Sequence, residues 1–173
     1  MEDLKGKLEK EFAKNSIVML SVSGADYRNA TSSLIDFSKR FRKTCYITLN
    51  DPSDVIRAKG HENLCFIDCV TATVKSTNER HDTIFISSPR ALTEISIALK
   101  KAIEKFGPDS VIFDSISALF VYEKSVSALK FLHNIILTIR SSNMKAVFVV
   151  LKEDVSEELM KDMSMFVDSV SEI

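Results

Sequence analysis

Apolar residues recur along this chain in two arrangements, and each predicts one kind of secondary structure. Apolar positions three or four residues apart predict amphipathic helices at residues 3–14, 29–42, 89–106 and 125–141, with one helical turn at 54–59. Short continuous apolar runs rich in β-branched residues predict buried strands at residues 16–23, 45–49, 64–70, 110–113, 146–151 and 166–173, and a brief extended segment at 83–87. Helices and strands therefore alternate along most of the chain.

Residues with special capping or backbone preferences mark where several of these elements begin and end. Ser88 and Pro89 suit the start of the third long helix, and Gly107 suits its end. Residues 154–157 resemble a capping box ahead of a short helix. The polar segment 71–82 has no clear periodicity, so we predict that it is a loop.

The character of the strands predicts the architecture. Strands that are apolar throughout are covered on both faces, which indicates a mainly parallel sheet with right-handed crossover helices. With 173 residues and no linker, repeat or low-complexity tract, the sequence predicts one domain over residues 1–173, including an N-terminal amphipathic helix at 1–14. Ligands of such sheets bind beyond the carboxyl ends of the strands, which directs attention to the segments that follow them.

Composition and charge exclude several classes of protein. The chain has 23 Lys and Arg against 24 Asp and Glu, so its net charge of -1 argues against nucleic-acid binding by bulk charge. No apolar run reaches the roughly 18 residues that a membrane-spanning helix needs, and the charged N-terminus is unlike a secretory signal. We therefore expect a cytoplasmic protein that does not bind membranes.

Cysteine and histidine spacing gives no sign of a metal site. We interpret Cys45, Cys65 and Cys69 as core thiols of a protein in a reducing compartment, because they form no CxxC pair. The three histidines have no metal-ligand spacing with the cysteines or with one another. The sequence therefore predicts that no metal is bound by these residues.

Several segments carry a resemblance to a known family. Residues 110–119, S-V-I-F-D-S-I-S-A-L, resemble the Walker B strand of the RecA/KaiC-like branch of P-loop ATPases, in which an apolar strand ends in Asp-Ser. Segments 88–99, 128–136 and 166–170 also lie where KaiC-like domains have similar elements. The resemblance covers roughly residues 14–173. It implies a RecA/KaiC-like P-loop fold, a three-layer α/β/α sandwich with a mostly parallel sheet.

The phosphate-binding loop of that family is altered in this chain. The family pattern G-x-x-x-x-G-K-[ST] aligns with Gly24-Ala25-Asp26-Tyr27-Arg28-Asn29-Ala30-Thr31. The first Gly and the final hydroxyl residue remain, but Asn29 replaces the second Gly and Ala30 replaces the Lys. A lysine about 4 Å from a phosphate is worth about 4 kcal/mol at an effective dielectric constant near 20. Because that cation is absent and Asp26 adds a negative charge, we expect Mg-ATP binding to be weakened by orders of magnitude.

The positions that would complete a hydrolytic site also differ from the family. KaiC-like ATPases carry a catalytic Glu after the second strand, where this chain has Asn50-Asp51, a pair that also suits an ordinary turn. The resemblance implies that Asp114, followed by Ser115, would hold Mg²⁺ through water in an active relative. Here we expect Asp114 to bond to Thr31 or to nearby backbone amides.

These departures predict a non-catalytic homologue that acts as a regulatory or scaffolding protein-binding module, without catalytic residues or a cofactor. Its expected partner is a second copy or an active RecA/KaiC-like ATPase. One alternative is a weak ATP-binding protein or ATPase that binds ATP and Mg²⁺ with Arg28 and Asp51 as substitutes. Another is an accessory factor in DNA recombination or repair, with a basic cluster at Lys39, Arg40, Arg42 and Lys43 as the contact. Those cations also complement a helix C-terminus, and the charge balance disfavours nucleic acid.

Overall fold

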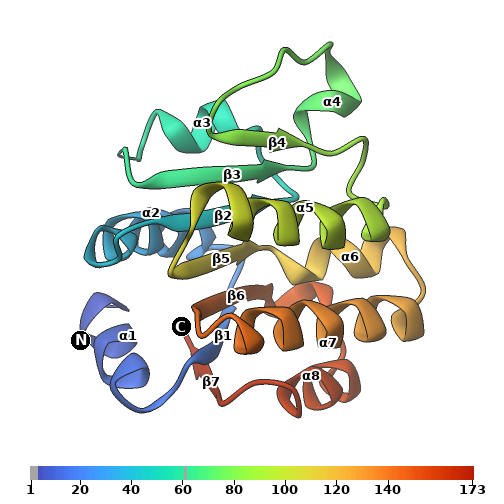
Figure 1. Cartoon of the computed structure of the whole chain (residues 1–173). Coiled ribbons are helices and arrows are strands. Elements are labelled where there is room, and N and C mark those ends of the chain that lie inside the picture. The colour runs from blue at the N-terminus through green and yellow to red at the C-terminus, as the bar shows by residue number, and fades with distance from the viewer. Residues whose placement is uncertain (1–3, 61) are drawn as a thin grey trace.

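The computed structural model describes residues 4–60 and 62–173, and in this part of the chain seven strands form one parallel sheet (Figure 1). The strand order is β4-β3-β2-β5-β6-β1-β7, and every paired strand runs parallel to its neighbour. The strands are β1 (Ile17–Val22), β2 (Thr44–Thr48), β3 (Leu64–Asp68), β4 (Thr83–Phe85), β5 (Ser110–Asp114), β6 (Lys145–Leu151) and β7 (Ser169–Glu172). The mostly parallel sheet predicted from the sequence is confirmed.

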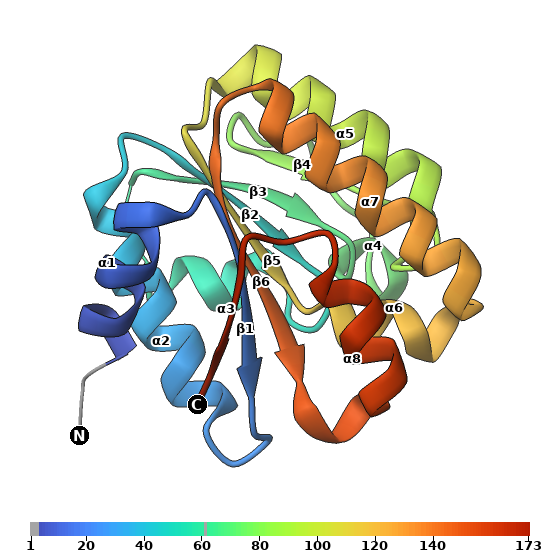
Figure 2. The same ribbon diagram turned by 90° about the horizontal axis from the view of Figure 1, so that it is seen from below.

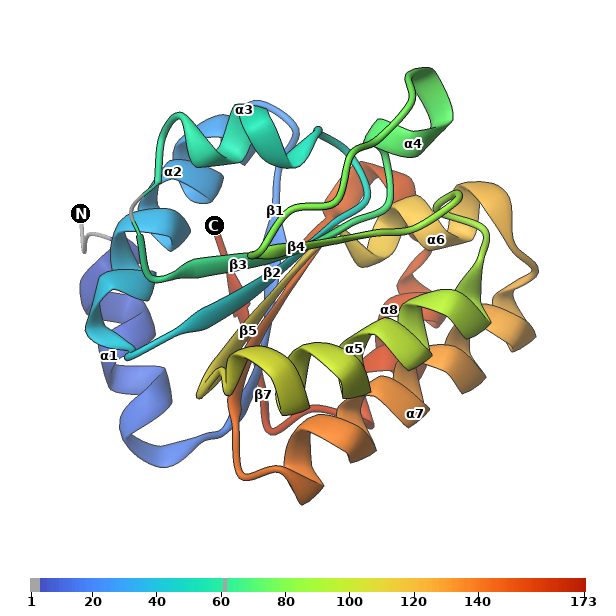
Figure 3. The same cartoon turned by 45° about the horizontal axis from the view of Figure 1, so that its top comes forward.

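Helices cover both faces of the sheet, as Figure 2 shows. One face carries α1 (Leu4–Lys14), α2 (Tyr27–Phe37) with the 3₁₀ turn η1 (Ser38–Arg40), and α3 (Ser53–Arg57). The other face carries α5 (Leu92–Phe106), α6 (Ile116–Tyr122), α7 (Ser125–Ser141) and, after the 3₁₀ turn η2 (Lys152–Asp154), α8 (Glu157–Ser164). The arrangement has the three layers that the strand pattern predicts, and α4 (Thr71–Val74) lies outside them beside β4 (Figure 3).

Each face of the sheet has its own hydrophobic core. All six residues of β1 are buried, and their side chains alternate between the two cores because successive residues of a strand point to opposite faces. Met19 packs on the α5–α8 side, whereas Leu20 packs on the α1–α2 side. This explains why the strands are continuous apolar runs in the sequence. The buried, free thiols of Cys45, Cys65 and Cys69 confirm their interpretation as core residues.

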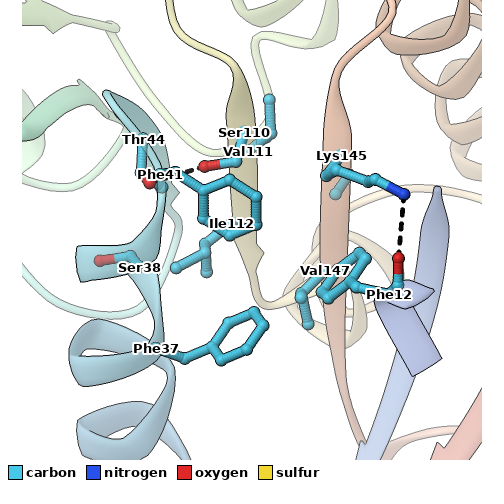
Figure 4. A pocket seen from close by; sticks show the side chains of 11 residues that line it. Phe12, Phe37, Ser38, Phe41, Thr44, Ser110, Val111, Ile112, Lys145 and Val147 are labelled. Atoms are coloured by element: carbon cyan, nitrogen blue, oxygen red, sulfur yellow. Dashed lines mark hydrogen bonds between the residues drawn. The ribbon is translucent and has the colours of Figure 1, made fainter. Parts of the chain in front are cut away.

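The first helix is fastened to the sheet by an aromatic cluster and one lysine. The Phe12 ring stacks on Phe37 with their centroids 5.6 Å apart, and Phe41 meets Phe12 edge-on (Figure 4). The Lys145 ammonium donates to the Phe12 and Asn15 carbonyl oxygens at 3.1 and 2.8 Å. These side chains border an apolar cavity of about 10 Å³, which is at the lower limit for a single water molecule. The cluster therefore holds α1 in place and leaves no room for a ligand.

Several predicted boundaries are wrong, and hydrogen bonds explain two of them. Helix α5 begins at Leu92 rather than at Pro89, because the Ser88 hydroxyl accepts a bond from Arg90 N in a preceding turn. Helix α8 is capped by Ser156, whose hydroxyl accepts from Leu159 N, rather than by the first residue of segment 154–157.

Two helices were not predicted. Four residues of the expected loop 71–82 form α4. Helix α6 follows β5 directly, where the sequence pattern gave no helix. Within residues 4–60 and 62–173, no helix is both long and apolar enough to cross a membrane.

Candidate functional site

The carboxyl ends of β1, β2, β5 and β6 bring the predicted site residues to one edge of the sheet. Strand β5 lies between β2 and β6, so its last residue, Asp114, is flanked by other strand ends. The main chain of Asp114 is fixed by Leu49 N, which donates to its carbonyl oxygen at 2.8 Å. Its side chain is 2% exposed, so the carboxyl group lies beneath the surface at the position where ligands of such sheets bind.

Two tyrosine hydroxyls satisfy the Asp114 carboxylate, and an asparagine amide donates to one of these hydroxyls. Tyr27, the first residue of α2, donates to Oδ1 at 2.7 Å, and Tyr46 of β2 donates to Oδ2 at 2.6 Å. The Asn50 amide donates to the Tyr27 hydroxyl at 3.0 Å and to Ser115 Oγ at 3.1 Å. Both oxygen atoms of the buried carboxylate therefore have a short bond from a neutral donor.

A serine pair extends this network to β6. The Ser115 and Ser117 hydroxyls are 3.1 Å apart, and Leu151 N donates to Ser117 Oγ at 3.0 Å. Ser115 and Ser117 are fully buried. The polar network thus links the start of α2 to the ends of β2, β5 and β6, and it is satisfied by the protein's own groups.

Burial governs the ionisation of this network. Burial raises the pKa of Asp114 above its usual value, and the nearby charge of Asp51 adds to the rise. The hydrogen bonds from Tyr46 and Tyr27 lower the pKa but do not outweigh burial. Burial, followed by the charge of Asp114, also raises the pKa of Tyr27 and of Tyr46. Both hydroxyls therefore stay protonated and act as hydrogen-bond donors at physiological pH.

Residues 24–31, which align with the phosphate-binding loop of RecA/KaiC-like ATPases, are mostly helical. Helix α2 begins at Tyr27, so only Gly24, Ala25 and Asp26 form the turn after β1. Ala30 lies in the helix with 3% exposure and packs in the core on the α1–α2 side. Arg28 and Asn29 are exposed on the same helix. The position that aligns with the phosphate-binding lysine of RecA/KaiC-like ATPases thus lies within the helix, on its core-facing side.

The expected bond between Asp114 and Thr31 is wrong. The Thr31 hydroxyl donates to the carbonyl oxygen of Tyr27, one helical turn earlier, at 2.8 Å. The early start of α2 causes this, because a threonine inside a helix can bond to the carbonyl four residues before it. Tyr27 takes the place that was expected for Thr31 beside Asp114.

The turn after β1 is surrounded by carboxylates. Gly24 N donates to both carboxylate oxygens of Glu153, at 3.2 and 3.1 Å. The Asp26 carboxylate accepts from the Ser23 hydroxyl at 2.6 Å. A phosphate approaching the Gly24 amide would have to displace one carboxylate and approach another, which Coulomb repulsion opposes.

The remaining candidate residues have ordinary structural contacts. Asp51 is exposed, and its main chain forms a turn in which the Thr48 hydroxyl donates to Asp51 O at 2.6 Å. In the basic cluster, Lys39 pairs with Asp36, and Arg42 donates to the carbonyl oxygen of Gly107 at 3.0 Å. These contacts confirm a turn at Asp51, and they show that Lys39 is paired within the end of α2 whereas Arg42 bonds to the carbonyl oxygen at the end of α5. No group of three or more His, Cys, Asp or Glu within residues 4–60 and 62–173 is arranged to hold a metal ion.

Sequence reasoning missed two residues of this edge, Tyr46 and Ser117. Tyr46 lies inside an apolar strand, where a tyrosine is indistinguishable from a packing residue until its hydroxyl partner is known. Ser117 lies in the helix that was not predicted. Glu153 belongs to segment 152–154, one of the segments after the strands to which the sequence directs attention, but its bond with Gly24 N was not predicted.

Comparison with known proteins gives a family but no activity. The model of a family of unknown function (DUF7504) matches residues 17–173, a range that begins at the first residue of β1 and leaves α1 outside. No curated protein matches the chain.

Proposed function

Because the chain belongs to this family of unknown function, its site is the guide to its role, and we propose that it is a non-catalytic relative of RecA/KaiC-like ATPases that acts as a regulatory or scaffolding protein-binding module. The resemblance of the segment around Asp114 to a Walker B strand supports the relationship. The buried and hydrogen-bonded state of Asp114 supports the loss of catalysis.

The observation that carries the proposal is the closure of Tyr27 over Asp114. An Asp that holds Mg²⁺ through water needs a carboxylate oxygen open to the ligand. Here Oδ1 accepts from Tyr27 and Oδ2 accepts from Tyr46, and the residue is 2% exposed. Binding a hydrated Mg²⁺ would require breaking at least one of these bonds and moving the first residue of α2.

Electrostatics supports the same conclusion. The missing lysine removes about 4 kcal/mol of attraction for a phosphate at about 4 Å, which is about three orders of magnitude in affinity. The Glu153 carboxylate on Gly24 N adds a repulsive charge where the loop begins. A triphosphate bound with micromolar affinity in an active relative would therefore bind here in the millimolar range.

A protein partner follows from the resemblance, since RecA-like domains commonly assemble side by side with nucleotide at the subunit boundary. Near the site, the corner between α6 and α7 exposes Val121 and Val126, at 70% and 65%. We propose that these two side chains form part of the contact surface with the partner. We propose either a second copy or an active ATPase of this kind as the partner.

Titration of the purified chain with a fluorescent ATP analogue and Mg²⁺ tests the proposal, with a competent RecA-like ATPase as positive control. We expect no saturation below 1 mM, and light scattering should detect self-association or a complex with the active relative. Micromolar binding that is lost in Arg28→Ala would overturn the proposal in favour of a weak ATP-binding protein. Salt-sensitive retention on single-stranded DNA would overturn it in favour of a recombination factor.

A further inference from the structure

A second pocket lies beside the site, between the carboxyl ends of β1 and β7 and the start of α8. The chain leaves β6, passes through η2 and enters α8 next to these strand ends (Figure 2). The pocket has a volume of about 290 Å³ and does not include Asp114 or its partners. Its walls include Ser21, Lys152, Val155, Glu157, Met160 and Glu172.

The inner wall of this pocket carries a hydroxyl group without a partner. Ser21 is 3% exposed and lines the pocket, and its hydroxyl makes no hydrogen bond to another group within residues 4–60 and 62–173. Ser21 is paired with Glu172 in the parallel ladder, so both side chains point to the face of the sheet that α8 covers. A hydroxyl group that opens into a pocket can accept a hydrogen bond from a cationic ligand there.

The charge around the pocket favours a cation. Residues 152–158 contain one Lys and four acidic residues, and Glu172 adds a fifth carboxylate. Lys152 lies 3.6 Å from Glu172, whereas the Glu157 carboxylate has no ion-pair partner within residues 4–60 and 62–173. A positive group entering beside Glu157 would therefore meet a net negative potential and an acceptor that is still free.

The remaining wall is apolar, which selects the kind of cation. Val155 and Met160 line the pocket together with the carboxylates. Lys and Arg side chains combine an aliphatic stem, which packs on such surfaces, with a charged end that seeks carboxylates. A volume of about 290 Å³ is at the small end for small-molecule sites, so the pocket fits one side chain better than a nucleotide.

We infer that this pocket receives an arginine or lysine side chain from a protein partner. The cationic end lies between the Glu157 and Glu172 carboxylates and donates to the Ser21 hydroxyl, and the stem packs on Val155 and Met160. The inference deepens the proposed function and rests on it, because it assumes that the chain has a protein partner. It specifies that the partner presents a basic segment to the carboxyl edge of the sheet.

An NMR titration of the full chain with the peptide acetyl-Gly-Arg-Gly-amide tests the inference. We expect saturable shifts at the amides of Ser21, Val155 and Glu172, with a dissociation constant in the millimolar range because a single side chain is bound. Glu157→Gln and Ser21→Ala should each weaken binding at least threefold. The matched variant Glu104→Gln, which removes an exposed carboxylate on α5, should leave it unchanged.

Two control ligands decide the chemistry. The same peptide with citrulline in place of arginine keeps the shape without the charge, and equal binding of that peptide would overturn the inference. Shifts at these amides with inorganic phosphate but not with the arginine peptide would overturn it too, since the pocket would then be an anion site formed by Lys152 and the start of α8. Mg-ATP added to the same sample reports separately on the proposed function, because its shifts would appear at residues 24–31.

Discussion

Asp68 offers a quantitative test of how this sheet holds the helices at its carboxyl edge. The residue ends β3, is fully buried, and accepts four hydrogen bonds. Oδ2 accepts from Ser53 N at 2.8 Å and from the Thr71 hydroxyl at 2.6 Å. Oδ1 accepts from Val70 N at 2.9 Å and from Thr71 N at 2.8 Å. One carboxylate therefore binds the starts of both α3 and α4.

The substitution Asp68→Asn keeps the shape and removes two acceptor sites. If the new amide nitrogen replaces Oδ2, the Thr71 hydroxyl can rotate to accept its proton, but Ser53 N is left without a partner. An orphaned buried donor costs about 1–3 kcal/mol. The two bonds to Oδ1 also lose their charge assistance, which is worth about 1 kcal/mol for each bond. We therefore expect the free energy of unfolding at pH 7 to fall by about 3–5 kcal/mol.

Urea unfolding of the wild type and the variant measures this difference, and its pH dependence identifies the cause. Burial acts to raise the pKa of Asp68, but the bonds from Ser53 and Thr71 outweigh it, so the folded pKa lies below the usual value. The stabilisation is therefore complete above the unfolded pKa of about 3.9 and is lost as the pH falls through the folded value. The difference between the two proteins should shrink over that range.

A matched control separates the buried carboxylate from a general effect of charge. Asp162→Asn removes an exposed carboxylate on α8 and should change the free energy of unfolding by less than about 0.5 kcal/mol. A loss of that small size for Asp68→Asn at pH 7, or a difference independent of pH, would refute the reasoning.

Three further outcomes follow from groups described above. Burial raises the pKa of Asp114 in the folded state, so ionisation of this carboxyl group opposes folding as the pH rises from the unfolded pKa through the folded pKa. In urea titrations, the wild type should therefore gain stability relative to Asp114→Asn as the pH is lowered from 7 to 4. Gly107 has φ +59° with no atom within 4 Å of an added Cβ, so Gly107→Ala should cost about 1 kcal/mol in thermal unfolding, from backbone strain alone; an unchanged Tm would contradict this. Lys145→Met removes both bonds to the end of α1, so hydrogen exchange should accelerate in α1 and stay unchanged in α7.

The strands were predictable because burial on both faces leaves a direct trace in the sequence. Ile17–Val22 is apolar at five of six positions, and a run of that length between turn signals favours a strand. Helix α7 was predicted with its observed bounds because its apolar stripe is regular. Helix α6 was missed because its sequence, I-S-A-L-F-V-Y, is apolar at six of seven positions and so has no period. The start of α5 depended on a turn whose hydrogen bonds no local pattern reveals.

The candidate site was predictable in place but not in structure. The order of apolar strands located Asp114 at the ligand-binding edge, and that location is independent of any side-chain partner. The contacts of Asp114 depend on where α2 begins, and the sequence pattern placed that start two residues too late, at Asn29 rather than at Tyr27. That small shift converts an expected loop residue into the first residue of a helix and brings its hydroxyl to Asp114. Long-range contacts of this kind are set by the tertiary structure rather than by the local sequence.

The position of β1 in the sheet has a consequence for synthesis of the chain. Both neighbours of β1 come from the other end of the sequence: Ile17–Val22 pairs with residues 146–151 of β6, and its other edge pairs with residues 169–172 of β7. About 120 residues separate the end of β1 from the start of β6, which at about 5–20 residues per second takes a ribosome roughly 6–25 seconds. During that time β2, β3 and β5 can pair with one another, whereas β1, which is apolar at five of its six positions, has no partner strand. Nascent chains stalled before Lys145 should therefore recruit chaperones through residues 17–22.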